Sequence, residues 1–404
     1  LLVINKTTPV QAAAPIGNYT TTQKRYIYVK GVAASAVYQV SGVDASGTEY
    51  GPINVLADAT PDSGSLAEVA ASIAAAINNS SGAWYNKWIA VVSSTTTGLV
   101  EIYRIASRSN LSNITTDNDV LTVSDSTGGA LISAINRSVS VVDDLPPRLP
   151  AGMQPAVGIK GVGTKIAYYM GWTNVKDGWV ETTANGGKIQ ADPTTFPYLI
   201  RPTGPGDKIV PITATLRRVG DTDSAPLPSF VGNCILDLSL FQNRIAILTD
   251  HSVSLSVPDA FTTDKSLMLS SPTLDFASDT ATAVMDDDPI DIQIGDAGLH
   301  HMAPLDTRLL LVGKKCVKSV GYNDFLSPKD VHLEHHLSTP SSADCNPLDV
   351  EGNILFTHSQ QATQIKELVA VPDTTKLAIS YRTRHLPTYL TAGITRLIGY
   401  SPAN

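Results

Sequence analysis

The chain has 404 residues, of which 43% are hydrophobic and only 16% are charged, and its formal net charge is -8. This length accommodates two or three ordinary domains with full apolar cores. Proteins that hold nucleic acid through its phosphates carry a basic face, so the acidic balance argues against tight DNA binding. It leaves open a loose passage of DNA through a channel.

Cysteine usage and hydropathy exclude further classes. The three cysteines, Cys234, Cys316 and Cys345, are an odd number without a C-x-x-C pair, which disfavours a disulfide framework and a structural zinc site. We expect reduced thiols in a protein made in a cytoplasm. No apolar run reaches the roughly 18 residues of a membrane span, and no cationic leader is visible. Because the chain starts on Leu1 as if inside a strand, we interpret it as a fragment or a trimmed product.

The first part of the chain is predicted to be β-rich. Residues 24–30 alternate β-branched and aromatic with polar side chains, and a turn at 44–47 separates two further strand-like runs at 37–40 and 48–50. A polar stretch at 107–118 is interpreted as a loop. The other predicted strands lie at 88–93, 99–105, 121–123 and 139–142.

One helix is predicted in this part, near residues 66–78. Apolar residues recur from Leu66 to Ile77 at three- and four-residue spacing, which is one face of a helix. Ser65 and Glu68 have the spacing of a capping box, and Asn78 is a suitable stop. The high alanine content suits close packing on a sheet, so we expect one covering helix.

The best domain boundary is the segment DDLPPRLP at 143–150, whose three prolines have no N–H group to donate inside a sheet. We therefore divide the chain into a first domain over 1–142, a linker over 143–150 and a second domain over 151–404. Short strands separated by turns in the second domain indicate a sandwich, barrel or propeller, although no repeat period is found. These strands lie at 165–170, 178–182, 197–201, 244–248, 253–257, 308–312, 317–320, 354–357 and 365–369.

The best metal candidate is the run VHLEHH at 331–336. On a strand, His332, Glu334 and His336 share one face and could converge on an ion, but the helical H-E-x-x-H pattern of zinc proteases is missing. The plainer interpretation, which we favour, is a polar strand face. The prediction is therefore no metal site, with these three residues as the candidates if one exists.

Two other patterns have an ordinary structural explanation. The cluster Asp286–Asp288 could hold a divalent cation, but it lacks EF-hand spacing and suits a turn in which Asp side chains accept backbone N–H bonds and Pro289 fixes the exit. The segment GIKGVGTK at 158–165 breaks the order of a phosphate loop and suits a hairpin. No nucleophile elbow occurs, so we predict neither an enzyme nor a cofactor.

Several motifs occur in a fixed order over most of the chain. RRVGDTDSAPLPSFVG at 217–232 is followed by an aromatic-x-N-R strand, a serine-rich strand and DDDPID at 286–291. Upstream are DGWVET at 177–182 and PTTFPYLIR at 193–201, and the hairpin and helix of the first part precede them. This series resembles the tail tubular protein B, or nozzle, family of short-tailed bacteriophages, in which corresponding motifs follow one another in the same order.

The resemblance assigns a set of structural motif residues. They are Arg218, Gly220, Asp221, Pro228, Ser229, Phe230, Gly232, Asn243, Arg244, Asp286, Asp287, Asp288, Pro289 and Asp291. One departure from the family pattern falls here, because Ala225 stands where the family has asparagine.

The resemblance also implies a fold and a role. The expected fold class is mainly β: a β-rich first domain with one covering helix, then an all-β, propeller-like region that is partial at its C-terminus. The expected role is a structural subunit of a hexameric ring beneath the adaptor ring and portal of a virion tail, assembled in the cytoplasm of the bacterial host. Genomic double-stranded DNA would pass through it transiently, and tail fibres are a further expected partner. The alternative is a glycan-binding or glycan-degrading tail protein.

Overall fold

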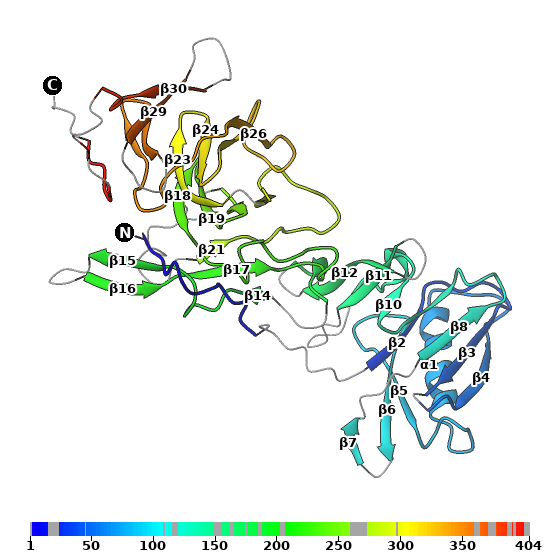
Figure 1. The fold of residues 1–404 in the computed structure, drawn as a ribbon. Coiled ribbons are helices and arrows are strands. Elements are labelled where there is room, and N and C mark those ends of the chain that lie inside the picture. Colours follow the sequence, from blue (N-terminus) through cyan, green and yellow to red (C-terminus); the bar gives the residue numbers. More distant parts are fainter. Residues whose placement is uncertain are drawn as a thin grey trace.

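The computed structural model confirms a mainly β chain with one α-helix among the residues that it describes (Figure 1). Those residues are 2–14, 24–44, 46–107, 110–114, 120–148, 156–161, 165–173, 176–184, 188–202, 207–258, 273–295, 298–358, 364–370, 377–385, 390 and 393–399. Their strands form eight sheets. No helix in these ranges is long and apolar enough to cross a bilayer.

The first part contains two sheets with α1 (Ser65–Ile77) packed between their strands. One sheet has the order β5-β6-β2-β9, with β7 paired to β6, and the other has the order β4-β3-β8. The helix buries its predicted apolar face, including Val69, Ile73 and Ile77, against them. The strands are β2 (Lys24–Val29), β3 (Val37–Val43), β4 (Glu49–Leu56), β5 (Trp88–Val92), β6 (Leu99–Ser107), β7 (Asn110–Ile114), β8 (Val120–Asp125) and β9 (Ile132–Ile135).

The predicted capping box is wrong, although the predicted helix and its stop at Asn78 are confirmed. Gly64 is the N-cap and Ser65 is already helical, so its hydroxyl does not cap the helix. Instead, Ser65 Oγ accepts a hydrogen bond of 2.8 Å from the N–H of Asp62. At the other end, the Asn78 side chain exchanges two hydrogen bonds with the backbone of Ala90, which ties the helix end to β5.

Two further expectations in the first part need correction. The stretch at 107–118 was expected to be a loop, but residues 110–114 form β7, whose backbone pairs with β6. The strand expected at 139–142 is shorter: β10 covers Ser138–Val139, and η1, a 3₁₀ turn, follows at Val142–Asp144. A polar strand such as β7 carries no alternating apolar signal, so its pairing is not visible in the sequence.

The predicted linker at 143–150 lies between segments that pack against each other. β10 pairs with β11 (Val157–Lys160), and a cluster that includes Tyr26, Leu145 and Trp172 buries side chains from both sides of the prolines. The division at 143–150 therefore stays a proposal. β11 continues into the sheet β10-β11-β12-β13 with β12 (Ile166–Thr173) and β13 (Gly178–Thr182), and the predicted hairpin at 158–165 is confirmed by the antiparallel β11–β12 pair.

Two smaller sheets connect this region to the rest of the chain. One has the order β1-β15-β16, and the other has the order β14-β17-β21. The N-terminal β1 pairs with β15, far along the chain, and Val10 is fully buried in the core beneath these sheets. The strands are β1 (Leu2–Val3), β14 (Ile189–Gln190), β15 (Tyr198–Pro202), β16 (Asp207–Pro211), β17 (Thr213–Arg217) and β21 (Thr273–Asp275).

Three four-stranded antiparallel sheets follow in sequence. They are β18-β19-β20-β22, β23-β24-β25-β26 and β27-β28-β29-β30, hereafter sheets L, M and N. Their strands are β18 (Asp237–Phe241), β19 (Arg244–Leu248), β20 (Ser252–Leu255), β22 (Ile290–Gln293), β23 (Leu299–Leu305), β24 (Arg308–Gly313), β25 (Val317–Gly321), β26 (His332–Leu337), β27 (Leu348–Val350), β28 (Asn353–His358), β29 (Gln364–Ala370) and β30 (Leu377–Tyr381).

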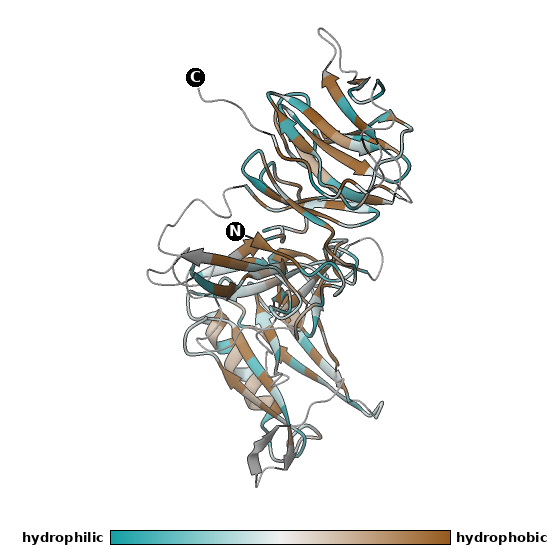
Figure 2. Ribbon diagram, turned by 60° about the vertical axis from the view of Figure 1, so that its left-hand side comes forward, coloured by the Kyte–Doolittle hydropathy of each residue, from teal (hydrophilic) through white to brown (hydrophobic). Residues whose placement is uncertain are grey.

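The three sheets stack face to face. In β24, Leu309 and Leu311 join a core shared with sheet L, whereas Leu310 and Val312 join a core shared with sheet N. Both faces of β24 are therefore buried, and β19 likewise divides its side chains between two cores, which explains the unbroken apolar runs of the two strands. Figure 2 shows the same pattern as hydrophobic colour concentrated along the strands of this stack.

Two adjacent buried histidines lie where the three sheets meet. His300 and His301 on β23 are 6% and 1% exposed, and their rings are 4.8 Å apart. The Ser341 hydroxyl lies 3.1 Å from His300 Nε2, but Nδ1 of His300 has no hydrogen-bond partner. Burial, together with the nearby His301, Lys314 and Lys6, lowers the pKa of His300 to about 4.

This depressed pKa predicts a loss of stability on mild acidification. The folded state keeps His300 neutral, so stability is full above its ordinary pKa of 6.5 and is lost as the pH falls toward 4. Between pH 7 and pH 5 we expect the free energy of unfolding to fall by about 2 kcal/mol more in the unmodified chain than in His300→Gln. Urea titrations of both proteins at the two pH values check this; equal losses would contradict it.

Candidate functional site

The motif segments, which are far apart in sequence, converge at one junction beside sheet L. Residues 217–232 begin at the last residue of β17, residues 243–244 pass from the β18–β19 turn into the first residue of β19, and residues 286–291 lead into β22. Hydrogen bonds join the second segment to the third, and the first segment to the third. The fold thus brings members of all three segments together, at a place that is hereafter called the motif junction.

Arg244 is the centre of this junction. Its side chain is almost fully buried, with 2% of the residue exposed, and burial lowers its pKa. The guanidinium donates to the carbonyl oxygens of Ser256 and Asp288 at 2.8 and 2.7 Å, and to those of Asp286 and Leu326 at 3.1 and 3.4 Å. One side chain therefore joins the residue that follows β20, the acidic turn and a loop of sheet M.

The turn before Arg244 explains the asparagine of the motif. Gln242 and Asn243 have positive φ values of 46° and 64°, and they form the two-residue connection between β18 and β19. Asparagine adopts this left-handed conformation more easily than most residues. This two-residue turn makes Phe241 and Arg244 the first pair of the β18–β19 ladder. Arg244 is thereby positioned so that its guanidinium reaches the acidic turn at 286–288.

The acidic cluster is a turn, as predicted. The N–H of Met285 donates to the Asp288 carboxylate at 2.7 Å, and Asp288 is buried. Asp286 is exposed and forms an ion pair of 3.0 Å with Lys329. The Asp288 carboxylate is thus engaged by the protein's own backbone, and Pro289 leads directly into β22 at Ile290.

Asp291 joins the first and third motif segments. Its carboxylate accepts the hydroxyl of Ser229 at 2.7 Å and the backbone N–H of Ser229 at 3.1 Å. The hydroxyl of Ser254, on the serine-rich β20, donates to the same carboxylate. Phe230 comes next and is fully buried between Phe196 and Phe276, with ring centroids at 6.0 and 5.0 Å.

The Gly220–Ser224 turn fixes the first segment. The Asp221 carboxylate accepts the N–H groups of Ser224 and Asp223 at 3.0 Å each, and these bonds lower its pKa. Tyr169 donates to the same carboxylate from β12. Gly220 has φ +68°, and its N–H and carbonyl bond to Thr182 and Ala184, so the turn is attached to the preceding sheet.

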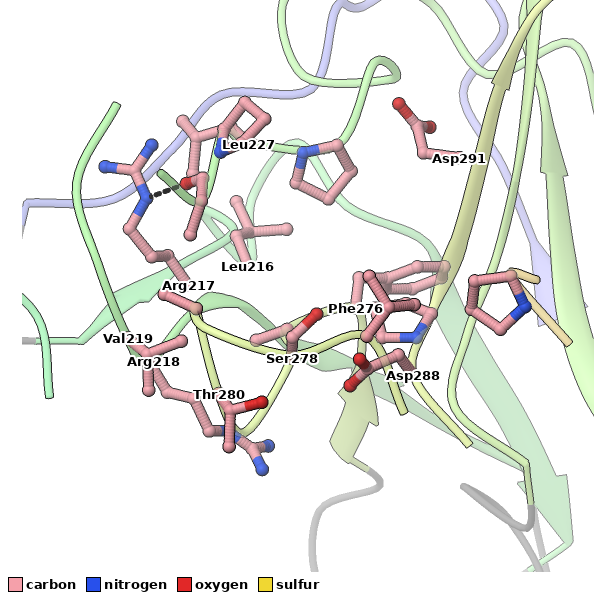
Figure 3. Close-up of a pocket in the computed structure, with 18 of the residues that line it drawn as sticks. Leu216, Arg217, Arg218, Val219, Leu227, Phe276, Ser278, Thr280, Asp288 and Asp291 are labelled. Atoms are coloured by element: carbon pink, nitrogen blue, oxygen red, sulfur yellow. Dashed lines mark hydrogen bonds between the residues drawn. The ribbon is translucent and has the colours of Figure 1, made fainter. Parts of the chain in front are cut away.

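A pocket of about 410 Å³ opens at the motif junction (Figure 3). Figure 3 shows Arg217 and Arg218 on one side and Asp288 and Asp291 on the other. Arg217 donates to the carbonyl of Ala225 at 2.6 Å, and Arg218 pairs with Asp275 and Asp279. The charged groups that line the pocket therefore have partners within the chain, and both carboxylates are engaged by N–H or hydroxyl donors.

The histidine candidates lie on one face of β26 but do not form a metal centre. His332 and His336 each place Nε2 within 3.6 to 3.7 Å of the Glu334 carboxylate. However, Arg308 pairs with Glu334 at 2.9 Å, and His336 is hydrogen-bonded to Ser319 at 2.7 Å. A guanidinium on the shared carboxylate disfavours a cation there, and the described residues contain no group of three ligands suited to a metal.

Comparisons with known proteins identify the family of the chain. The model of the bacteriophage nozzle protein family matches residues 2–404. The chain belongs to this family. It is also similar to the protein named tail tubular protein gp12 of Escherichia phage T7, with 25% identity over 294 residues. That alignment covers 71% of this chain but only 35% of the T7 protein, so the chain spans about a third of that relative's length.

Sequence reasoning missed several residues of the nozzle motif junction. Arg217 stands beside an assigned residue, and Tyr169 and Ser254 support Asp221 and Asp291 from other strands. A signal was present for Ser254, because serine recurs along β20, but its role depends on a carboxylate 37 positions away. No local pattern could have identified Tyr169, which lies in a different sheet.

Substitution of Gly220 should be more costly than substitution of Gly232. An added Cβ at Gly220 would lie 2.5 Å from Ser224 Oγ and 3.0 Å from Ala225 Cβ, whereas at Gly232 nothing lies within 4 Å. Both residues have positive φ. We expect Gly220→Ala to cost about 2–3 kcal/mol and Gly232→Ala about 1 kcal/mol, as measured by urea unfolding. If both variants lose the same free energy of unfolding, the turn at Asp221 accommodates the added methyl group without strain.

Removal of the Arg244 guanidinium should destabilise the nozzle chain strongly. Arg244→Met leaves buried carbonyls without donors, and we expect a loss of about 3 kcal/mol or more in the free energy of unfolding. Lys329→Met is the matched control, because it removes a half-exposed partner of the same acidic turn and should cost under about 1 kcal/mol. If the two variants unfold at the same denaturant concentration, Arg244 is not the centre of the junction.

Proposed function

We propose that this chain is a structural subunit of the tail nozzle of a short-tailed phage. Six copies would form a ring beneath the adaptor ring, with the genome passing through the centre and tail fibres attached nearby. The observation that carries the proposal is the family match over residues 2–404, together with the gathering of the family motifs at one structural junction. The proposed location is the virion tail.

The stacked sheets support a β-propeller within this subunit. Sheets L, M and N are consecutive four-stranded antiparallel sheets, and each shares one core with the next. That arrangement is typical of neighbouring propeller blades. In this proposal the later domain, over 151–404, carries part of a propeller, and the first domain, over 1–142, packs beside it.

A structural role agrees better with the junction than catalysis does. Asp288 and Asp291 both line the pocket, but their carboxylates hold the Met285 N–H and the serines Ser229 and Ser254. A general acid or base needs a proton that it can exchange with a substrate. We therefore favour a scaffold over the alternative of a glycan-degrading tail protein.

The acidic balance supports a conduit. A net charge of -8 on each copy becomes large when it is repeated around a ring. An inner wall with this sign would repel phosphates and allow DNA to slide rather than bind. The surface potential of the assembled ring tests this part of the proposal; a basic inner wall would refute it.

Cryo-electron microscopy of virions that carry this protein tests the main proposal. We expect six copies around the tail axis, with the motif junction intact in each copy. Copies located only in peripheral spikes, together with release of sugar fragments from host surface glycans by the purified chain, would instead establish the glycan-degrading alternative.

A further inference from the structure

The first described residues do not pack on the module that follows them in sequence. Residues 2–14, hereafter the strap, lie along the later part of the chain, beside β15, β17 and β14 (Figure 1). Their hydrogen bonds to other segments, within the described ranges, go to residues between 190 and 234. The strap is therefore separated from its binding partners by the whole first module.

The strap occupies a strand-acceptor groove made of residues 190–199 and 231–234. Val10 donates to the carbonyl of Asn233 at 3.0 Å and accepts from Gly232 at 2.7 Å. Ala13 donates to Gln190, and Gln11 accepts from Asp192, both at 2.8 Å. Most of this recognition uses the main chain, which is how an extended peptide adds to an exposed strand edge.

One side chain anchors the strap. Val10 is fully buried in the core with Phe230 and Ile212, whereas Leu2 and Ile4 are only partly buried. Between these points, Asn5 to Thr8 form a local turn held by their own side chains. A segment with one deep anchor and a main-chain ladder can leave and re-enter its groove at the cost of a local opening.

We propose that this groove is an exchangeable strand-acceptor site, and that in the assembled ring it receives the strap of a neighbouring copy. The inference rests on the ring of the proposed function. The hydrogen bonds of the groove come from residues 190–234, and the core that buries Val10 also includes Leu274 and Phe276 of the same copy, so a strap from any copy meets the same donors, acceptors and anchor pocket. Exchange conserves these contacts and links each subunit to the next.

The length of the connection sets a limit on this exchange. Nine residues, 15–23, join the strap to β2 along the chain, so the neighbour's groove must lie within about 30 Å, the most that nine residues can span when fully extended. In a ring, the neighbour's groove competes with the subunit's own groove at high effective concentration. The exchanged straps would stabilise the ring against dissociation through contacts that already exist within one copy, so no new side-chain interface is needed.

Cysteine cross-linking tests the exchange, because Pro9 lies directly opposite Cys234 in an antiparallel bridge. We would mix full-length chains that carry Pro9→Cys and Cys234→Ser with unmodified chains, assemble them and oxidise them. A disulfide between positions 9 and 234 can then form only between two chains. We expect a two-chain product roughly tenfold above the control, since paired positions in a ladder have the geometry of a disulfide.

The control carries Thr7→Cys and Cys234→Ser, which places an exposed thiol on the same strap but away from Cys234. Native mass measurement of the same samples reports separately whether a ring forms.

A ring without the two-chain product overturns the exchange and leaves the proposed function standing. A two-chain product without a ring supports the exchange and contradicts the ring. A further sample contains only chains that carry Pro9→Cys and keep Cys234. If these chains assemble into a ring and every disulfide forms within one chain, the exchange is also overturned.

Discussion

The buried guanidinium of Arg244 is the constraint on which the later part of this chain depends. A cation that is 2% exposed must be surrounded by acceptors, and here the acceptors are four main-chain carbonyls rather than a carboxylate. Carbonyls have fixed positions on the backbone, so the charge is satisfied only when β20, the acidic turn and the loop at Leu326 are all in place. The interaction therefore specifies how sheet L meets sheet M, beyond the non-directional burial of apolar side chains.

The same dependence on neighbours runs through the stack. Strands β19 and β24 place alternate side chains in two different cores, so neither strand has a solvated face to stabilise it alone. The core beneath β17 needs Val10 from the far end of the chain, and the cluster around Trp172 needs side chains from before and after the prolines at 146–150. Apolar burial of this kind joins consecutive sheets into one structure. The prolines interrupt the sheet, but they do not separate the packing of the segments on their two sides.

The sequence was most predictive where the signal is local. The amphipathic helix at 66–77 follows from side-chain periodicity, the strands β13 and β19 follow from short runs of β-branched, aromatic and other apolar residues, and the structure confirms all three. Three elements were not predicted because their cause is not local. β7 pairs through its backbone, and β23 carries Pro304 and two histidines within a strand. The strap depends on partners about 200 positions away. The motif residues were assigned as a set through resemblance, and the hydrogen bonds of Arg244 and Asp291 show how the fold joins three of their segments.

The acidic residues of the motif illustrate how composition can mislead about chemistry. Asp221, Asp288 and Asp291 each accept N–H or hydroxyl groups of nearby segments that leave the regular ladders. A carboxylate accepts several such bonds at once, which makes aspartate the natural residue for a turn that must be both tight and fixed. Their negative charge is therefore a consequence of structural bonding, and the pocket between them is bordered by groups that already have partners.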